Sequence, residues 1–183
     1  ARDLGNWQGL AEAYRVNAVG YFREGNHTKA IGIFQQAVKI IGDRPAKYLL
    51  GKIYSDLSSA HSALFRPQDG LDELKKAIGI FEKIGQKFEL VIANYNLGIS
   101  FLLGGDWTKA KEIFTRTKDQ AAEIKHPYLA LISASLAEIE FLQGNYEKAE
   151  NILTEALKSA TEARKERYKV PVLYNLARCL LAQ

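Results

Sequence analysis

Apolar residues recur every three or four positions along most of the chain, and short segments rich in glycine and polar residues interrupt the resulting stripes. Two such stripes flank Gly104-Gly105, and their small and apolar members are Leu97, Gly98, Phe101, Ala110, Ile113 and Phe114. This spacing predicts two amphipathic helices. Glycine suits the φ > 0 conformation that ends a helix, and Asp106 is a suitable N-cap for the second helix. The segment therefore predicts a helical hairpin in which Gly98 and Ala110 lie at the close contact.

The same order of helix, turn and helix recurs along the chain. It predicts four hairpins and a ninth helix, at about residues 6–41, 45–84, 86–124, 127–165 and 169–182. Within three of the hairpins we expect individual helices at 6–24, 27–41, 45–65, 67–84, 127–143 and 145–165. The small residues Gly98, Ala137 and Ala177 occupy the same place in successive units and are 39 and 40 residues apart. The sequence therefore repeats with a period close to 40 residues.

The second hairpin departs from this pattern at its turn. Phe22 and Ala30 are eight residues apart in the first hairpin, whereas Phe65 and Ala77 are twelve residues apart in the second. Phe65-Arg66-Pro67-Gln68 replaces the glycine-containing turn, and proline suits the first turn of a helix. We therefore expect the fourth helix to begin at Pro67, in a unit that carries four extra residues.

The residues that recur at fixed places in the hairpins resemble the motif of the tetratricopeptide repeat: Leu97-Gly98, Phe101, Gly105-Asp106-Trp107, Ala110 and Phe114. The commonest form of that repeat has about 34 residues, so the longer period here implies roughly one extra helical turn in each hairpin. Such long repeats resemble those of kinesin light chains, Pins-type adaptors, Rap-type peptide receptors and MalT-type regulators. The resemblance implies one all-α domain over residues 1–183, a right-handed superhelical solenoid whose first helices line the concave surface.

Two asparagines stand at matching places on predicted first helices, because Asn96 and Asn175 each precede the Leu-Gly or Leu-Ala pair of their unit. In kinesin light chains and Pins-type adaptors an asparagine at this step grips the backbone of a bound peptide, and the resemblance implies the same role here. The matching residues of the other units are Val16, Ser59 and Ser135, which interrupt the series. The alternative for each asparagine is a hydrogen bond to a neighbouring helix or to water.

Further candidates for partner binding lie on adjacent turns of the same helices: Tyr95, Ile99, Tyr174, Arg178, Arg15 and Arg23. Tyrosine and arginine are the residue types that dominate binding hot spots. Arg15, Arg23 and Arg66, which is also expected on the concave surface, as a group favour a partner with some acidic or carboxylate character. Each arginine taken singly is more typical of a solvated surface.

The remaining chemistry-bearing residues are scattered. His27, His61 and His126 are far apart, and none has a ligand partner three or four positions away. The single cysteine, Cys179, lies on an apolar helical stripe, where a buried thiol is expected. The sequence contains no phosphate-binding loop, HExxH motif or nucleophile elbow. We therefore expect no catalytic site, no cofactor and no metal.

Charge and composition narrow the class of partner. The 25 basic and 21 acidic residues are interspersed and give a net charge of +4, which does not favour nucleic acid. No apolar run approaches the ~20 residues of a membrane span, and no signal peptide opens the chain, so we expect a cytoplasmic protein without a membrane partner. The chain contains no methionine and begins with Ala1, which indicates either a processed protein or a fragment of a longer one, and favours the fragment.

These expectations combine into a functional hypothesis. We expect a non-catalytic scaffold or adaptor that binds a peptide segment of another protein in its concave groove. The first alternative is a regulatory or effector-sensing segment of a larger signalling protein or transcription regulator, and the second is an enzyme. The apolar last helix, 169–182, predicts one face that is either exposed or covered by a second copy of the chain.

Overall fold

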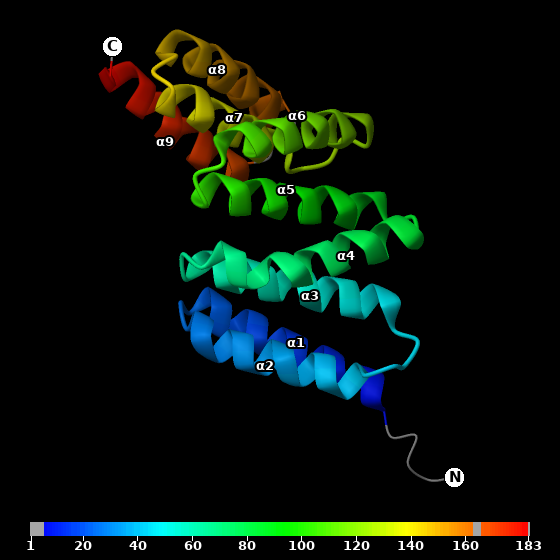
Figure 1. The fold of residues 1–183 in the computed structure, drawn as a ribbon. Coiled ribbons are helices and arrows are strands. Elements are labelled where there is room, and N and C mark those ends of the chain that lie inside the picture. The colour runs from blue at the N-terminus through cyan, green and yellow to red at the C-terminus, as the bar shows by residue number, and fades with distance from the viewer. Residues whose placement is uncertain (1–5, 163–165, 183) are drawn as a thin grey trace. The chain divides into compact units, whose positions relative to one another are not determined.

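The computed structural model describes residues 6–162 and 166–182, and within this part of the chain every regular element is a helix (Figure 1). The elements are α1 (Trp7–Arg23), α2 (His27–Ile41), α3 (Lys47–Ala63), η1 (Pro67–Gly70), α4 (Leu71–Lys83), α5 (Lys87–Leu103), α6 (Trp107–Glu123), α7 (Leu129–Leu142), α8 (Tyr146–Glu162) and α9 (Glu166–Ala182). The predicted all-α class is therefore confirmed. None of these helices is both long enough and apolar enough to cross a membrane. The right-handed superhelical path of the whole array stays a prediction.

Helix ends follow the capping chemistry of the sequence. The side chains of Asn6, Asn26 and Asp106 accept hydrogen bonds from the backbone N–H group three residues later, at 2.9, 3.3 and 3.1 Å. Each thereby satisfies an N–H group that has no partner inside its helix. At two helix C-termini, Gly25 and Gly105 adopt φ values of 81° and 82°, which glycine reaches without strain. The turns predicted at these glycines are confirmed.

Two helices begin later than predicted. The sequence places prolines in the first turns of the helices at 45–65 and 127–143, but α3 begins at Lys47 and α7 at Leu129. Before α7, the backbone N–H of Tyr128 donates to Nδ1 of His126 at 3.0 Å, so a side chain closes this turn before the helix starts. Before α3, Ala46 is the N-cap with φ of −122°, outside the helical region.

The chain forms two compact units, an N-terminal unit (Ala1–Gly104) and a C-terminal unit (Gly105–Gln183). In the N-terminal unit α1 packs against α2, α2 against α3, α3 against α4, and α4 against α5. The first helices of successive hairpins also meet, because α3 contacts both α1 and α5. The buried core of this unit alternates small and large residues, including Ala11, Ala18, Ala30, Phe34, Ile53, Ala60, Ala77 and Phe81. That the whole chain is one domain stays a prediction.

The four extra residues of the second hairpin form the separate element η1. The helix predicted from Pro67 is therefore wrong in part, because a single 3-10 turn precedes α4. Pro67 and Gly70 are both buried. A Cβ at Gly70 would lie only 2.9 Å from Cα of Ser58 on α3, which explains the glycine. The four extra residues thus form a turn that packs against α3 through Pro67 and Gly70 instead of lengthening α4.

In the C-terminal unit α6 packs against α7, and α7 packs against both α8 and α9. Ala137 and Ala149, predicted at the close contact of the α7–α8 hairpin, are fully buried in one core cluster. Cys179 belongs to the same cluster, as predicted, and burial raises the pKa of its thiol. Gly98 and Ala110 are each buried in their own unit, and their mutual contact stays a prediction.

The last helix starts earlier than predicted. α9 begins at Glu166 instead of residue 169, and Pro171 lies inside it, where its missing N–H group removes one helical hydrogen bond. Residues 163–165, which the sequence assigns to the end of the preceding helix, lie outside the described residues. The predicted apolar face is confirmed, because Leu173 and Leu180 are 47% and 55% exposed.

Candidate functional site

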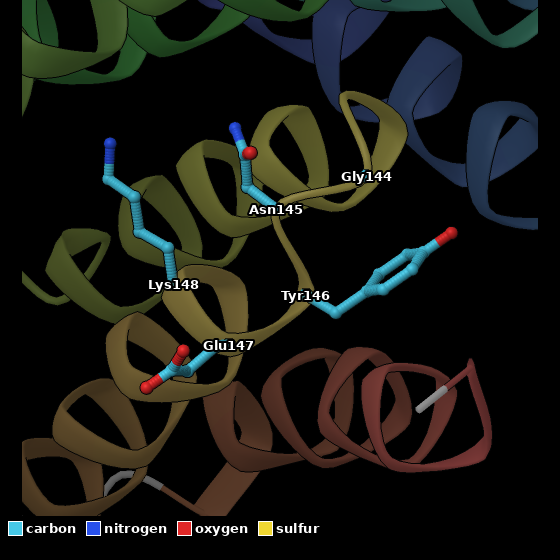
Figure 2. Close-up of a pocket in the computed structure, with 5 residues that line it drawn as sticks. All are labelled: Gly144, Asn145, Tyr146, Glu147 and Lys148. Atoms are coloured by element: carbon cyan, nitrogen blue, oxygen red, sulfur yellow. The ribbon is translucent and has the colours of Figure 1, made fainter.

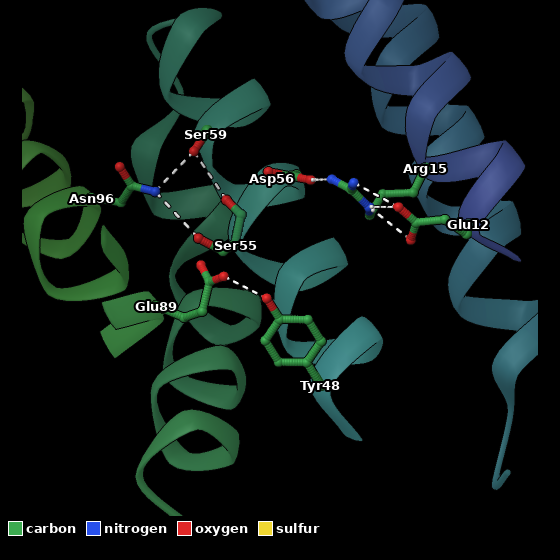
Figure 3. Close-up of polar contacts among 8 residues, drawn as sticks. All are labelled: Glu12, Arg15, Tyr48, Ser55, Asp56, Ser59, Glu89 and Asn96. Atoms are coloured by element: carbon green, nitrogen blue, oxygen red, sulfur yellow. Dashed lines mark hydrogen bonds and ion pairs between the residues drawn. The ribbon is translucent and has the colours of Figure 1, made fainter. Parts of the chain in front are cut away.

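The first helices of the N-terminal unit are joined by polar contacts between side chains that lie about one repeat apart (Figure 3). Nη1 of Arg15 lies 2.9 Å from Oδ2 of Asp56, which joins α1 to α3. Tyr48 donates its hydroxyl proton to Oε1 of Glu89 at 2.7 Å, which joins α3 to α5. In both pairs the partners are 41 residues apart, so the repeat period itself places them opposite one another. We call the surface that carries these contacts the inner face of the N-terminal unit.

Arg15, a predicted partner-binding residue, is held by carboxylates of this chain. Nη2 of Arg15 lies 2.8 Å from Oε1 of Glu12, in addition to the contact with Asp56. Only 14% of the Arg15 side chain is exposed. The hydrogen bond with Glu12 is the main cause that raises the pKa of Arg15 above its ordinary value. Arg23, the second predicted arginine of this unit, is exposed and makes no ion pair with a described residue.

Asn96 has a defined orientation on α5. Its Nδ2 lies 3.0 Å from Oγ of Ser59 and 3.3 Å from Oγ of Ser55, both on α3. Because Ser59 already donates its hydroxyl proton to the backbone oxygen of Ser55, Oγ of Ser59 can only accept from Asn96. This requirement fixes which end of the amide faces α3. Oδ1 of Asn96 accepts no hydrogen bond from a described residue, and Figure 3 shows it turned away from both serines.

The sequence predicted some of the other residues near this surface and missed one. Tyr95 and Ile99 are both half-buried on α5. Tyr48, which the sequence reasoning missed, is 44% exposed, and its hydrogen bond to Glu89 raises the pKa of its hydroxyl to about 12. The Tyr48 side chain borders a hollow of about 450 Å³. The residues that line this hollow are Asn6, Gln8, Gly9, Glu12, Tyr48, Leu49 and Lys52. The available signal was the spacing, because a hydroxyl donor and a carboxylate one period apart on first helices are expected to meet.

In the C-terminal unit the predicted residues Tyr174, Asn175 and Arg178 lie together on α9. Nη1 of Arg178 is 2.9 and 2.7 Å from the two carboxylate oxygens of Glu138 on α7, and this hydrogen bonding raises the pKa of Arg178. The same nitrogen lies 3.4 Å from Oδ1 of Asn175. The guanidinium also lies over the rings of Phe141 and Tyr174, 4.5 and 5.7 Å from their centroids. Arg178 is therefore held within its unit, whereas Nδ2 of Asn175 donates to no described residue.

Glu140, which the sequence did not single out, is only 2% exposed at the end of α7. Nζ of Lys111 and of Lys148 lie 2.7 and 2.9 Å from its Oε1, and Nδ2 of Asn145 donates to its Oε2 at 2.9 Å. Burial alone would raise the pKa of Glu140, but these three contacts outweigh burial and hold the pKa at about 2. Figure 2 shows Asn145 and Lys148 on the same side of the α7–α8 turn, with Tyr146 pointing in a different direction.

An open hollow of about 730 Å³ borders this turn and is larger than the hollow at Tyr48. Size does not make it the better candidate. Its lysine and its asparagine already bind Glu140, so a ligand there would have to displace a buried carboxylate from its partners. The cluster joins α6, α7 and α8, and its evident role is to hold these helices together.

The predicted site residues thus fall into two groups, with Arg15, Arg23, Tyr95, Asn96 and Ile99 in the N-terminal unit and Tyr174, Asn175 and Arg178 in the C-terminal unit. That the two groups line one continuous groove stays a prediction. Among residues 6–162 and 166–182, no group of three or more His, Cys, Asp or Glu side chains is arranged to hold a metal ion.

Comparison with protein families gives a match in the second half of the chain. Residues 89–162 match the family model described as tetratricopeptide repeat. This segment contains most of α5 and all of α6, α7 and α8. No curated protein matches the chain in sequence.

Solved structures share the fold. A putative kinesin light chain from Podosopora anserina with nearly identical TPR-like repeats superimposes with a TM-score of 0.75 at 16% identity, over 98% of this chain and 89% of that one. A Rap protein complexed with competence and sporulation factor gives 0.82 at 18% identity, over 93% of this chain and 51% of that one. A signal transduction ATPase with numerous domains and a tetratricopeptide repeat sensor, from Pyrococcus horikoshii, gives 0.80 at 17% identity, over 97% of this chain and 28% of that one. This chain therefore spans about half of the Rap protein, and identities this low establish the fold alone.

Proposed function

We propose that this chain, whose residues 89–162 match the tetratricopeptide repeat model, is a non-catalytic interaction module that binds a peptide segment of another protein along its inner face. The observation that carries the proposal is the orientation of Asn96. Ser59 holds the amide nitrogen, so the oxygen is presented outward as an acceptor. A backbone N–H group of an extended peptide is a donor that this oxygen would accept whatever the peptide's side chains.

The surroundings of Asn96 support a preorganised surface. The contacts of Arg15 with Asp56 and of Tyr48 with Glu89 tie α1, α3 and α5 together through side chains of the inner face. Side chains that are already held lose less conformational freedom when a ligand binds, which favours affinity. Tyr48 adds an exposed aromatic surface beside the hollow that it borders.

The expectation of a partner with carboxylate groups needs revision. The group of arginines favoured a partner with carboxylate groups, but Arg15 is neutralised by Glu12 and Asp56, and Arg178 by Glu138. An acidic partner would compete with carboxylates that are already in place. We therefore propose that neutral hydrogen bonds and apolar contact, more than charge, select the peptide.

A regulatory role is the second candidate. The structural likeness to a Rap protein complexed with competence and sporulation factor and to a signal transduction ATPase with a tetratricopeptide repeat sensor favours it. In that case the peptide or effector bound at the inner face would shift the assembly of a larger cytoplasmic protein. The sequence on either side of this chain discriminates the two, because a nucleotide-binding or DNA-binding neighbour favours the regulator.

The test compares the wild-type chain with the double variant Asn96→Ala, Asn175→Ala and with Asn151→Ala, which changes an exposed asparagine on α8. A protein captured by the wild-type chain is purified and titrated against each variant. Loss of the Asn96 bond, worth about 0.5–1.5 kcal/mol, predicts roughly twofold to tenfold weakening, and loss of a second bond at Asn175 on the C-terminal unit raises the expected weakening to roughly tenfold or more, with none for the control. Equal affinity for all three chains removes the asparagines from the mechanism. A partner that maps to the second helices, α2 and α4, contradicts inner-face binding.

A further inference from the structure

The turn after α3 exposes an aromatic side chain in an unfavourable backbone conformation. Phe65 is 83% exposed and has φ of +57°. Residues other than glycine seldom adopt positive φ, because the Cβ atom then crowds the backbone. An exposed phenylalanine gains nothing from burial that would offset this strain. Two features that each disfavour phenylalanine therefore coincide at one residue.

Other helix ends use glycine in the equivalent place. The N–H of Arg66, directly after Phe65, donates to the carbonyl of His61 at 3.0 Å, five residues earlier. The N–H groups of Asn26 and Asn145 donate to the carbonyls five residues earlier in the same way, and in those turns the residue before the donor is Gly25 or Gly144. Phe65 thus fills a position that this chain gives to glycine after α1 and α7 and to Lys125 after α6, where the N–H of His126 donates to the carbonyl of Ala121.

The turn that carries Phe65 is held firmly. The N–H of Phe65 donates to the carbonyl of Ser62 at 2.9 Å, and Pro67, two residues later, is buried within η1. The close fit of Gly70 against Ser58 fixes the other end of η1. The ring of Phe65 itself makes no contact with another aromatic ring among the described residues. The aromatic group is therefore presented to the outside on a rigid support.

A cationic residue follows Phe65 directly in the sequence. Arg66 is exposed and makes no ion pair with a described residue. Arginine and aromatic residues are the types that most often dominate binding energy when a partner encloses them. A ring followed directly by an unpaired guanidinium is complementary to an apolar pocket with a carboxylate at its rim.

We propose that Phe65 and Arg66 form a docking projection that inserts into an apolar pocket of a folded partner protein, with Arg66 pairing to a carboxylate at the rim of that pocket. The partner's pocket removes the ring from water, and this gain offsets the strain that Phe65 stores in the free chain. The projection lies at the turn between α3 and η1, outside the contacts that define the inner face. It is therefore a second interaction surface, independent of peptide binding at Asn96.

The chain itself offers a matched control. Lys125, after α6, is the other non-glycine residue with positive φ among the described residues, at +51°, and it is also exposed. Replacing either residue with glycine relieves the same kind of backbone strain, so Phe65→Gly and Lys125→Gly are both expected to melt at or above the wild-type temperature. Any difference in binding then reports the lost side chain and not damage to the fold.

The experiment places a photo-reactive benzophenone side chain at position 65 and, in a separate protein, at position 125. A partner cross-linked only from position 65 is purified and titrated. We expect Phe65→Gly to weaken its affinity at least tenfold, and Lys125→Gly and the Asn96→Ala, Asn175→Ala variant to leave it unchanged. Arg66→Gln is expected to weaken affinity severalfold and to reduce its dependence on salt. No cross-link specific to position 65, or equal affinity for Phe65→Gly and Lys125→Gly, overturns the proposal.

Discussion

Ser59 and Asn96, 37 residues apart on α3 and α5, are joined by a hydrogen bond of 3.0 Å whose direction is fixed by the serine. We predict that Ser59→Ala frees the amide of Asn96 to rotate, since only Oγ of Ser55, at 3.3 Å, still lies nearby. The loss in unfolding free energy should be about 0.5–1.5 kcal/mol. Affinity for an inner-face peptide should fall less than with Asn96→Ala, because the acceptor oxygen is still present.

Urea denaturation and peptide titration check both effects, and Ser159→Ala, which changes an exposed serine on α8, is the control. A stronger binding loss for Ser59→Ala than for Asn96→Ala would contradict the orientation role.

The fold was largely predictable because its signals are local. Helical spacing, the caps Asn6 and Asp106, and the positive-φ glycines each act within a few residues, and the period then places equivalent residues at equivalent steps. The short 3-10 turn at Pro67 was missed, because four extra residues can extend a helix or form a turn, and only packing against Ser58 decides between them.

The candidate site was predictable only in outline. The sequence selects Asn96 and Arg15 by their step in the repeat, but Asn96 bonds to Ser59, 37 residues away, and Arg15 bonds to Asp56, 41 residues away, as well as to the nearby Glu12. Whether a polar side chain faces a ligand or a neighbouring helix depends on those partners. Nδ2 of Asn96 binds Ser59 on a neighbouring helix, which is the alternative that the sequence left open, and contact of its Oδ1 with a ligand stays a prediction. Arg15 is held by Asp56 and Glu12.

Replacing either of two helical glycines of the N-terminal unit with alanine should change the stability in opposite directions. A Cβ at Gly79 on α4 has no neighbouring atom within 4 Å, so Gly79→Ala should stabilise the unit by about 0.5–1 kcal/mol through helix propensity. A Cβ at Gly51 on α3 would lie 2.8 Å from Cε1 of the buried Phe81 ring, so Gly51→Ala should destabilise by about 1–3 kcal/mol. Thermal and urea unfolding of the two variants provide the comparison. The same sign of change for both would show that the close packing of α3 on α4 is misplaced.

The ion pairs of Glu140 should make the stability of the C-terminal unit fall in acid. Its folded pKa, about 2, lies below the ordinary value near 4.5, so the unfolded chain binds more protons between these pH values. The stabilisation is therefore fully present above about pH 4.5 and is lost as the pH falls toward 2. Glu140→Gln should cost about 1–3 kcal/mol at pH 7, after allowance for the partly exposed lysines, and the deficit should shrink between pH 5 and pH 2.

Urea unfolding at several pH values tests this, with Glu155→Gln as a control that changes an exposed carboxylate on α8. Only the Glu140 variant should converge with the wild-type chain in acid. A deficit that stays constant down to pH 2 would mean that Lys111 and Lys148 do not favour the ionised carboxylate as the contacts imply.

The exposed face of α9 predicts self-association through the C-terminal unit. Leu173 and Leu180 are seven residues apart and therefore lie on one side of the helix, and both are exposed, whereas Leu176 packs against the core. An apolar stripe at this spacing suits packing against another helix, and a second copy of the chain supplies the same stripe.

We expect sedimentation equilibrium to show a reversible dimer for the wild-type chain. The double variant Leu173→Lys, Leu180→Lys should be monomeric. It should melt within a few degrees of the wild-type monomer, because neither leucine contributes to the core. Leu176→Lys, by contrast, should lower the melting temperature of the monomer itself. A wild-type chain that stays monomeric across the accessible concentration range would rule out this interface.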